Sequence, residues 1–206
     1  MNAPARFPAP VPGLTGPFYD LSLFPWLPRI AENWTVIRDE LLTLQDGAFS
    51  AWPERHIYDK GWNVFGLYVF SVRLDRHCDL VPRTAALIET IPGLATAAFS
   101  RLAPRAHIKP HAGFAEGLLR LHVPLICPPG CLLRVEDQVQ EWRAGECFVF
   151  DDARVHEAWN GSTRPRTVLI VDFRADDLVR RNHKPRKVEN AVRRLFGLRA
   201  DYTYLR

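Results

Sequence analysis

A mainly β domain, a barrel or jelly roll with flanking helices, is predicted for this chain by three observations. Short apolar stretches follow one another from about residue 63 to residue 173. Segments typical of turns separate them, among them PPG, RAGE, DDAR and NGSTRPR. Helical periodicity lies mostly near the two ends of the chain. With 206 residues, 47% of them hydrophobic and 24% charged, the chain has the length and composition of one globular domain.

The N-terminal residues 1–28 are rich in proline and aromatic residues and are predicted to form an extended arm packed on the domain. Residues 29–206 then form a single domain. From about residue 28 to residue 44, apolar side chains recur every three or four positions, which predicts an amphipathic helix. A second helix is predicted from about 82 to 90, ended by Pro92-Gly93, and a third from about 187 to 196, ended by Gly197.

The strands are predicted where apolar and β-branched residues concentrate between turns. One of them reads Leu119-Arg120-Leu121-His122-Val123. Because successive side chains of a strand point to opposite faces, Arg120 and His122 should share a face, opposite the three apolar residues. The predicted strands are 63–73, 117–126, 131–135, 146–150, 155–159 and 166–173.

Charge and composition narrow the classes of function. No apolar run approaches the roughly 20 residues that span a bilayer, and the N-terminus lacks the apolar stretch of a secretory signal. We therefore expect a cytoplasmic protein that does not enter a membrane. Residues 174–206 carry a net charge of +6 and the rest of the chain carries −2. This basic tail is expected to be a solvated helix rather than a nucleic-acid surface. The four cysteines are too few for a disulfide framework and are expected to be reduced.

Three histidines are the best candidates for chemistry, because phosphate-loop, GxSxG and HExxH signatures are all absent. His111 lies in HIKPHAG, His122 shares a strand face with Arg120, and His156 follows the turn DDAR. Histidines and an arginine inside a barrel would be costly to bury without a metal or an anion. Asp151 and Asp152, in the same turn as the last of these motifs, are expected to cap their own backbone. His107 and Arg105, near His111 in the chain, are further candidates for contact with a substrate.

Segment 100–173 resembles the catalytic domain of the aspartyl/asparaginyl β-hydroxylases. The PHxG element, the RLH strand, the FDD…HEAWN turn and the arginine-containing stretch before VLIVDF match in order and spacing. A weaker match continues upstream at Asp59-Lys60-Gly61-Trp62. The resemblance implies a double-stranded β-helix, the jelly roll or cupin-like barrel, with flanking helices. It also implies a dioxygenase that depends on iron(II), 2-oxoglutarate and O₂.

The resemblance assigns roles to seven residues. His111 and His156 match the two iron ligands, and Arg166 matches the anchor of the far carboxylate of 2-oxoglutarate. Ser100, Arg120 and His122 match further cosubstrate contacts, and Trp62 matches another pocket residue. The carboxylate that commonly lies two residues after the first histidine is replaced by Gly113. The family works without it, but iron halogenases also have a small residue there, which leaves room for chloride.

The implied reaction is hydroxylation of an unactivated C–H bond. The β-carbon of an Asp/Asn-type amino acid, free, carrier-bound or peptidyl, is the expected target, so the partners are small-molecule, amino-acid or peptidyl substrates. Two alternatives stay open at this point. One is a non-catalytic cupin-like barrel that binds a metal or another ligand, and the other is an iron halogenase that uses the same site.

Overall fold

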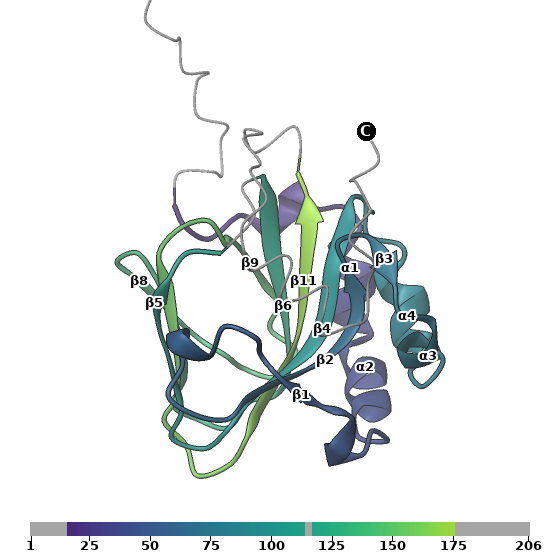
Figure 1. Cartoon of the computed structure of the whole chain (residues 1–206). Helices are drawn as coiled ribbons and strands as arrows, with labels where there is room; N and C mark the ends of the chain where they lie inside the picture. Colours follow the sequence, from purple (N-terminus) through teal and green to yellow (C-terminus); the bar gives the residue numbers. More distant parts are fainter. Residues whose placement is uncertain (1–15, 114–116, 176–206) are drawn as a thin grey trace, which may run out of the picture.

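A computed structural model describes residues 16–113 and 117–175 of the chain. Two β-sheets face each other, and helices cover the outer side of the larger sheet (Figure 1). The larger sheet has the order β1-β2-β4-β11-β6-β9, with β3 paired to β2, and the smaller has the order β5-β10-β7-β8. The strands of the larger sheet are β1 (Ser50–Ala51), β2 (Trp62–Val69), β3 (Val72–Arg73), β4 (Leu94–Leu102), β6 (Leu118–Ile126), β9 (Phe148–Asp151) and β11 (Arg166–Arg174). Those of the smaller sheet are β5 (His107–His111), β7 (Cys131–Val135), β8 (Gln138–Glu141) and β10 (His156–Asn160).

The eight strands from β4 to β11 divide evenly between the two sheets, and the chain crosses from one sheet to the other repeatedly. This is the order of a double-stranded β-helix, so the predicted fold class is confirmed. Within the described residues no ladder joins the two sheets, which therefore pack face to face rather than close into a continuous barrel. All neighbouring strands are antiparallel.

Two apolar cores lie on opposite faces of the larger sheet. Leu119, Leu121 and Val123 pack toward the helices, while the core between the sheets contains side chains from both of them. Arg120 and His122 line a pocket in that second region. The predicted alternation along this strand is therefore confirmed. Full burial of each of the three aliphatic side chains is worth about 2 kcal/mol, which is enough to prevent a one-residue slip that would exchange the faces.

The helices form a layer beside β2 and β4 (Figure 1). The predicted helix 28–44 is two helices, α1 (Leu27–Glu32) and α2 (Trp34–Leu41), because the chain breaks at Asn33. The prediction of a helix near 82–90 is confirmed by α4 (Pro82–Ile88), whereas α3 (Asp75–Cys78) was not predicted. Both carboxylate oxygens of Glu40 accept from the backbone N–H groups of Arg83 and Thr84, which joins α2 to the start of α4. The predicted helix 187–196 and the basic tail lie outside the described residues.

Four strands of the two sheets were absent from the prediction, namely β1, β4, β5 and β8. Strand β4 is the most important, because it lies between β2 and β11 and carries Ser100. The predicted strand 63–73 is divided into β2 and β3 by a tight turn at Phe70 and Ser71, which both have positive φ. The other five predicted strands correspond to β6, β7, β9, β10 and β11.

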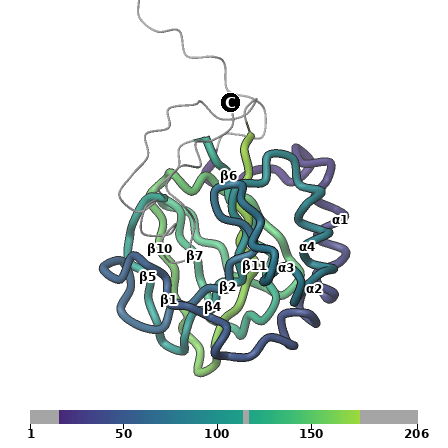
Figure 2. The backbone as a smooth tube through the Cα atoms, turned by 45° about the vertical axis from the view of Figure 1, so that its right-hand side comes forward, coloured from purple at the N-terminus to yellow at the C-terminus, as the bar shows by residue number. Residues whose placement is uncertain are grey.

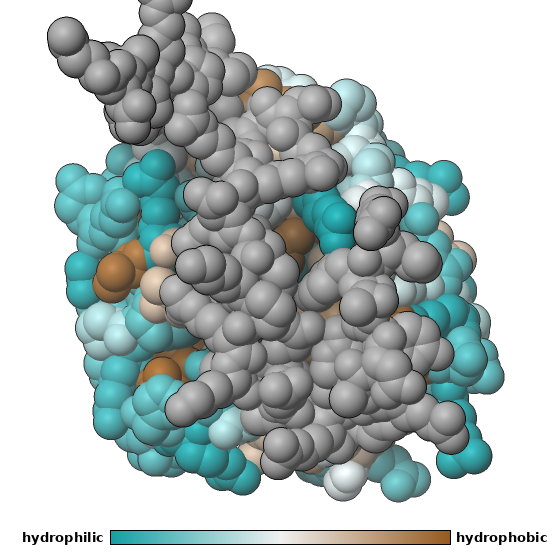
Figure 3. Space-filling view, turned by 45° about the horizontal axis from the view of Figure 1, so that its top comes forward, coloured by the Kyte–Doolittle hydropathy of each residue, from teal (hydrophilic) through white to brown (hydrophobic). Residues whose placement is uncertain are grey.

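Two further segments complete the domain. The segment between β1 and β2 crosses to the edge of the smaller sheet, where Tyr58 bridges to Ile108 (Figure 2). Near the N-terminus, Phe18 bridges to Phe150, so this part of the chain runs beside β9. In the view of Figure 3 the described surface is mostly polar, and apolar side chains emerge only in small separate groups. None of the helices in the described ranges is long and apolar enough to cross a membrane. All four cysteines are free thiols, as predicted.

Candidate active site

His111 and His156 lie side by side on β5 and β10. The two residues are direct partners in the ladder, and their ring centroids are 4.2 Å apart. The Nδ1 atoms lie 2.8 Å from the backbone carbonyl oxygens of Lys109 and Arg154, respectively. A carbonyl can only accept, so each Nδ1 carries the proton and each Nε2 keeps a free lone pair. Histidine ligands of metals are commonly oriented by such a bond from the other ring nitrogen.

Both of these histidines are neutral near pH 7. Burial and, to a smaller extent, the nearby His156 lower the pKa of His111 to about 4. Burial also lowers the pKa of His156 to about 4. The neutral imidazole is the form that binds a metal ion.

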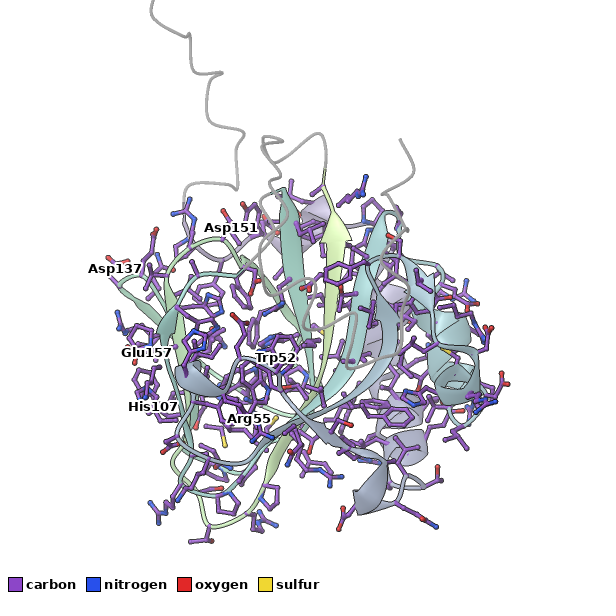
Figure 4. All side chains as sticks on the ribbon, in the orientation of Figure 1. Trp52, Arg55, His107, Asp137, Asp151 and Glu157 are labelled. Carbon is purple, nitrogen blue, oxygen red and sulfur yellow. The ribbon has the colours of Figure 1, made fainter. Side chains whose placement is uncertain are left out.

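A backbone irregularity directs His111 into the space between the sheets. The register shifts so that two steps along β10, from His156 to Ala158, match three steps along β5, from His111 to Ile108. Such a bulge changes which side chains of a strand share a face. His107 consequently lies on the outer face, where it stacks on Trp159 with 5.1 Å between ring centroids. Figure 4 shows His107 and its partner Glu157 on the outer side of the smaller sheet. His107 therefore does not line the pocket, and its contact with a substrate stays a prediction.

The role predicted for Asp152, a cap of its own turn, is wrong, although the same prediction for Asp151 is confirmed. Asp151 caps the turn, because its Oδ1 accepts from the N–H of Ala153 at 3.0 Å. Asp152 instead is only 3% exposed, with Oδ1 3.4 Å from His156 Nε2. A Cβ atom on Gly113 would lie 1.7 Å from Asp152 Oδ2. The carboxylate of Asp152 therefore fills the space that a side chain two residues after His111 would need.

Arg120 holds this carboxylate together with a second one. Its Nη1 lies 2.5 Å from Asp152 Oδ1, and its Nε and Nη2 donate to the two oxygens of Asp172 at 2.6 and 2.9 Å. Burial raises the pKa of both carboxyls, and the guanidinium opposes this rise. Two buried carboxyls therefore share one guanidinium beside two neutral histidines. When both are ionised, the cluster has an excess of negative charge that a cation would offset.

Arg166, on β11, is by contrast a buried positive charge. It is 2% exposed, and it forms no ion pair with any described residue. Its Nη1 donates to the carbonyl of Ser100 at 3.4 Å, and its Nε has no hydrogen-bond partner. Burial lowers its pKa to about 10, so it remains charged at pH 7. A buried cation without a counter-ion is a candidate anion-binding group.

Two indoles fix the polar groups next to Arg166. Trp142 Nε1–H donates to His122 Nδ1 at 3.0 Å, and Trp62 Nε1–H donates to Ser100 Oγ at 3.0 Å. Burial lowers the pKa of His122 well below its ordinary value, so this ring is neutral. With its Nδ1 accepting, His122 has its proton on Nε2, and Ser100 keeps its hydroxyl proton available. Both side chains can therefore donate to an anion.

One pocket joins these groups, with about 360 Å³ of space free of protein atoms, its open mouth included. Six of the seven predicted site residues line it: Trp62, Ser100, Arg120, His122, His156 and Arg166. His111 is not among the lining residues but contacts His156, which is one of them. Apolar side chains from both sheets, such as Ile108 and Ile170, form the remaining wall.

Four further residues of the site were missed by the sequence analysis. Asp152 was attributed to the turn, and Asp172 is the partner of Arg120 in the β6–β11 ladder. A single acidic residue and a single arginine within apolar strands could have indicated the pairing of Asp172 with Arg120. Trp142 and Glu54 carry no such signal. Trp52 lies between the two sheets (Figure 4), stacks on Trp62 with centroids 4.6 Å apart, and donates to Glu54 at 3.2 Å.

The family model and the sequence relatives indicate one family. Residues 31–176 match the family model described as aspartyl/asparaginyl beta-hydroxylase. The chain is 38% identical over 170 residues to the ornithine lipid ester-linked acyl 2-hydroxylase of Rhizobium tropici, which covers 76% of this chain and 60% of that protein. It is 32% identical over 152 residues to the human aspartyl/asparaginyl beta-hydroxylase, which covers 69% of this chain and 20% of that protein. The chain thus spans only part of the length of these relatives. Among solved structures, a Pseudomonas putida prolyl-4-hydroxylase is similar over 74% of this chain and 88% of its own, with 17% identity and a TM-score of 0.48.

Proposed function

Since the chain belongs to the aspartyl/asparaginyl β-hydroxylase family, we propose that it is an iron(II)- and 2-oxoglutarate-dependent dioxygenase that hydroxylates an unactivated C–H bond. One observation carries the proposal. The pocket joins two environments: His156 with the neutral His111 and the carboxylates that Arg120 holds, and the buried Arg166, which has no ion-pair partner among the described residues. A divalent cation fits the first of these environments, and a carboxylate fits the second.

The side chains of His111 and His156 would hold the iron through their Nε2 atoms. The neutral state and the orientation of both rings support this role. Asp152 lies close enough to His156 to contact a water molecule or the metal itself, and Arg120 holds it there. The alternative of an iron halogenase fits less well. The carboxylate of Asp152 fills the space beside Gly113, and it would repel a chloride ion.

The far carboxylate of 2-oxoglutarate would bind Arg166, with His122 and Ser100 as further donors. A guanidinium can form two parallel charge-assisted hydrogen bonds to a carboxylate, which fixes the orientation of the cosubstrate. Arg120 was predicted as a cosubstrate contact as well, and this stays a prediction. Its bonds to Asp152 and Asp172 favour a role in holding the acidic cluster. When bound, iron and 2-oxoglutarate together with O₂ supply the oxidising chemistry, and the protein supplies orientation and a largely apolar enclosure.

Two classes of substrate are proposed. We propose the β-carbon of an Asp/Asn-type amino acid, free, carrier-bound or peptidyl, on the basis of the family. An ester-linked acyl chain of an amino-acid lipid is the second candidate, because the bacterial relative named for that reaction has the higher identity, 38% against 32%. Screening Asp- and Asn-containing peptides beside ornithine lipids for stimulated succinate formation would separate these two classes.

The class of enzyme is tested by succinate formation from 2-oxoglutarate in protein loaded anaerobically with iron(II) and then given O₂. Wild-type protein is compared with His156→Ala and Arg166→Ala, and with His107→Ala as a matched control on the outer face of β5. We expect iron- and O₂-dependent turnover that the first two substitutions abolish and the control preserves. A protein that binds a metal but never consumes 2-oxoglutarate would be a non-catalytic binding barrel. Absence of both metal binding and 2-oxoglutarate binding would refute the proposal.

A further inference from the structure

Trp142 lies between the two groups that would bind the far carboxylate of the cosubstrate. It follows β8, and its backbone N–H donates to the carbonyl of Cys131 at the start of β7. From this position in the smaller sheet its side chain reaches His122 on β6 and Arg166 on β11, both in the larger sheet. The side chain is 1% exposed, so its orientation is set by packing on all sides.

The face of the indole supports Arg166. The guanidinium carbon lies 4.4 Å from the ring centroid. An aromatic face stabilises a cation without accepting hydrogen bonds from its N–H groups, which lie in the guanidinium plane. A carboxylate in the same place would pair with those N–H groups and compete with any incoming anion. The ring therefore stabilises the buried charge and leaves its donors available for a ligand.

The edge of the same indole determines the tautomer of His122. Indole Nε1–H can only donate, and it donates to His122 Nδ1 at 3.0 Å. The proton of the neutral imidazole must then be on Nε2, which becomes a donor. Both groups next to the bound carboxylate are consequently donors, and neither can accept.

We infer that Trp142 is a positioning residue that makes the cosubstrate pocket selective for an ionised carboxylate. The inference rests on the proposed function, because it assumes that 2-oxoglutarate binds at Arg166. With Arg166 and His122 both as donors, the pocket matches a carboxylate, which only accepts. It should reject the corresponding ω-amide, 2-oxoglutaramate, because the amide NH₂ would meet two donors and leave a buried polar group unpaired.

The test uses the full chain loaded with Mn(II) in place of iron, and calorimetry with 2-oxoglutarate and with 2-oxoglutaramate as probes. Trp142→Phe keeps an aromatic face under Arg166 but removes the N–H, and Trp142→Leu removes both. We expect Trp142→Phe to bind 2-oxoglutarate about five- to tenfold more weakly and to discriminate less against the amide. Trp142→Leu should bind it at least about 50-fold more weakly. Trp26→Phe, in the aromatic cluster with Phe24 and Phe173 on the helical side, is the matched control and should change neither affinity.

Nitrogen-15 NMR of the histidine rings supplies a readout that does not depend on the cosubstrate. The His122 signals should show one tautomer, with the proton on Nε2, in the wild type and a mixture in Trp142→Phe. Unchanged affinities together with an unchanged tautomer would overturn the inference. An equal loss of Mn(II) affinity, 2-oxoglutarate affinity and melting temperature would also overturn it, because that result indicates a general packing role. If the wild type binds no 2-oxoglutarate, the proposed function fails, while the tautomer measurement still tests the role of Trp142.

Discussion

Replacement of Gly113 by alanine should destabilise the domain through Asp152. The added Cβ would lie 1.7 Å from Asp152 Oδ2, 2.4 Å from its Cγ and 2.7 Å from its backbone oxygen. Ordinary contact needs at least about 3.4 Å, so the carboxylate must move away by more than the length of a bond. It cannot do so freely, because Arg120 holds Oδ1 at 2.5 Å and the N–H of Gly113 donates to the Asp152 carbonyl at 2.6 Å.

The magnitude follows from these contacts. Overpacking of a filled site costs about 1–3 kcal/mol, and loss of one partner from a buried ion pair costs about 3–5 kcal/mol. We expect a loss of about 3–5 kcal/mol in the free energy of unfolding. For a domain of this size that corresponds to a decrease of roughly 10 °C in melting temperature.

The assay is urea denaturation and thermal melting of metal-free protein, followed by Mn(II) binding. Gly47→Ala is the matched control, because a Cβ on Gly47 meets no atom within 4 Å. The control should stay within about 0.5 kcal/mol of the wild type. If Gly113→Ala melts with the control and binds Mn(II) as well as the wild type, the carboxylate does not fill this space and the reasoning is refuted.

Three further outcomes are expected. Arg166→Gln should weaken 2-oxoglutarate binding about 100-fold in calorimetry. The melting temperature should stay unchanged or rise, because the substitution removes a buried cation without an ion-pair partner among the described residues. A large loss of stability would contradict this expectation. Asp172→Asn should lower the free energy of unfolding by about 3–5 kcal/mol in urea titrations, because Arg120 loses its bidentate partner. A change below about 1 kcal/mol would argue against that pairing. Burial raises the pKa of the Cys127 and Cys147 thiols to about 12, so at pH 8 only about one molecule in 10⁴ has either thiolate. Iodoacetamide should therefore label both thiols much more slowly in native than in urea-unfolded protein, and equal rates would show that they are accessible and ionised.

The parts of the fold that could be predicted are those with a strong local pattern. Strand β6 alternates apolar residues with Arg120 and His122, and this alternation alone indicates which side chains face the pocket. Strand β4 was missed because Leu94–Leu102 is rich in alanine and has few of the β-branched residues that mark a strand. It forms the middle of the larger sheet through pairing on both sides, which is a property of the whole fold.

The site residues that could be predicted are those that belong to motifs resembling a known family. Asp152 was misassigned because an aspartate in a turn usually caps its own backbone, and only the position of Arg120 across the fold shows otherwise. Trp142 could not be found, because nothing in its neighbourhood along the chain indicates that it reaches Arg166 and His122. Arg166 itself could have been an exposed residue at a strand edge, and its burial between Trp142 and Ser100 excludes that alternative.

The bulge in β5 has a consequence for the evolution and engineering of the site. In a regular strand His107 and His111, four residues apart, would face the same side. The extra residue separates them, so that His107 stacks on Trp159 outside and His111 pairs with His156 inside. The proposed metal centre is thus encoded in the number of residues between Ile108 and His111 as well as in their identity. A regular strand with the same number of residues would instead pair His156 with Pro110 and turn His111 to the outer face. A relative that retains both ligands should therefore have either this bulge or one residue fewer between the positions of Ile108 and His111.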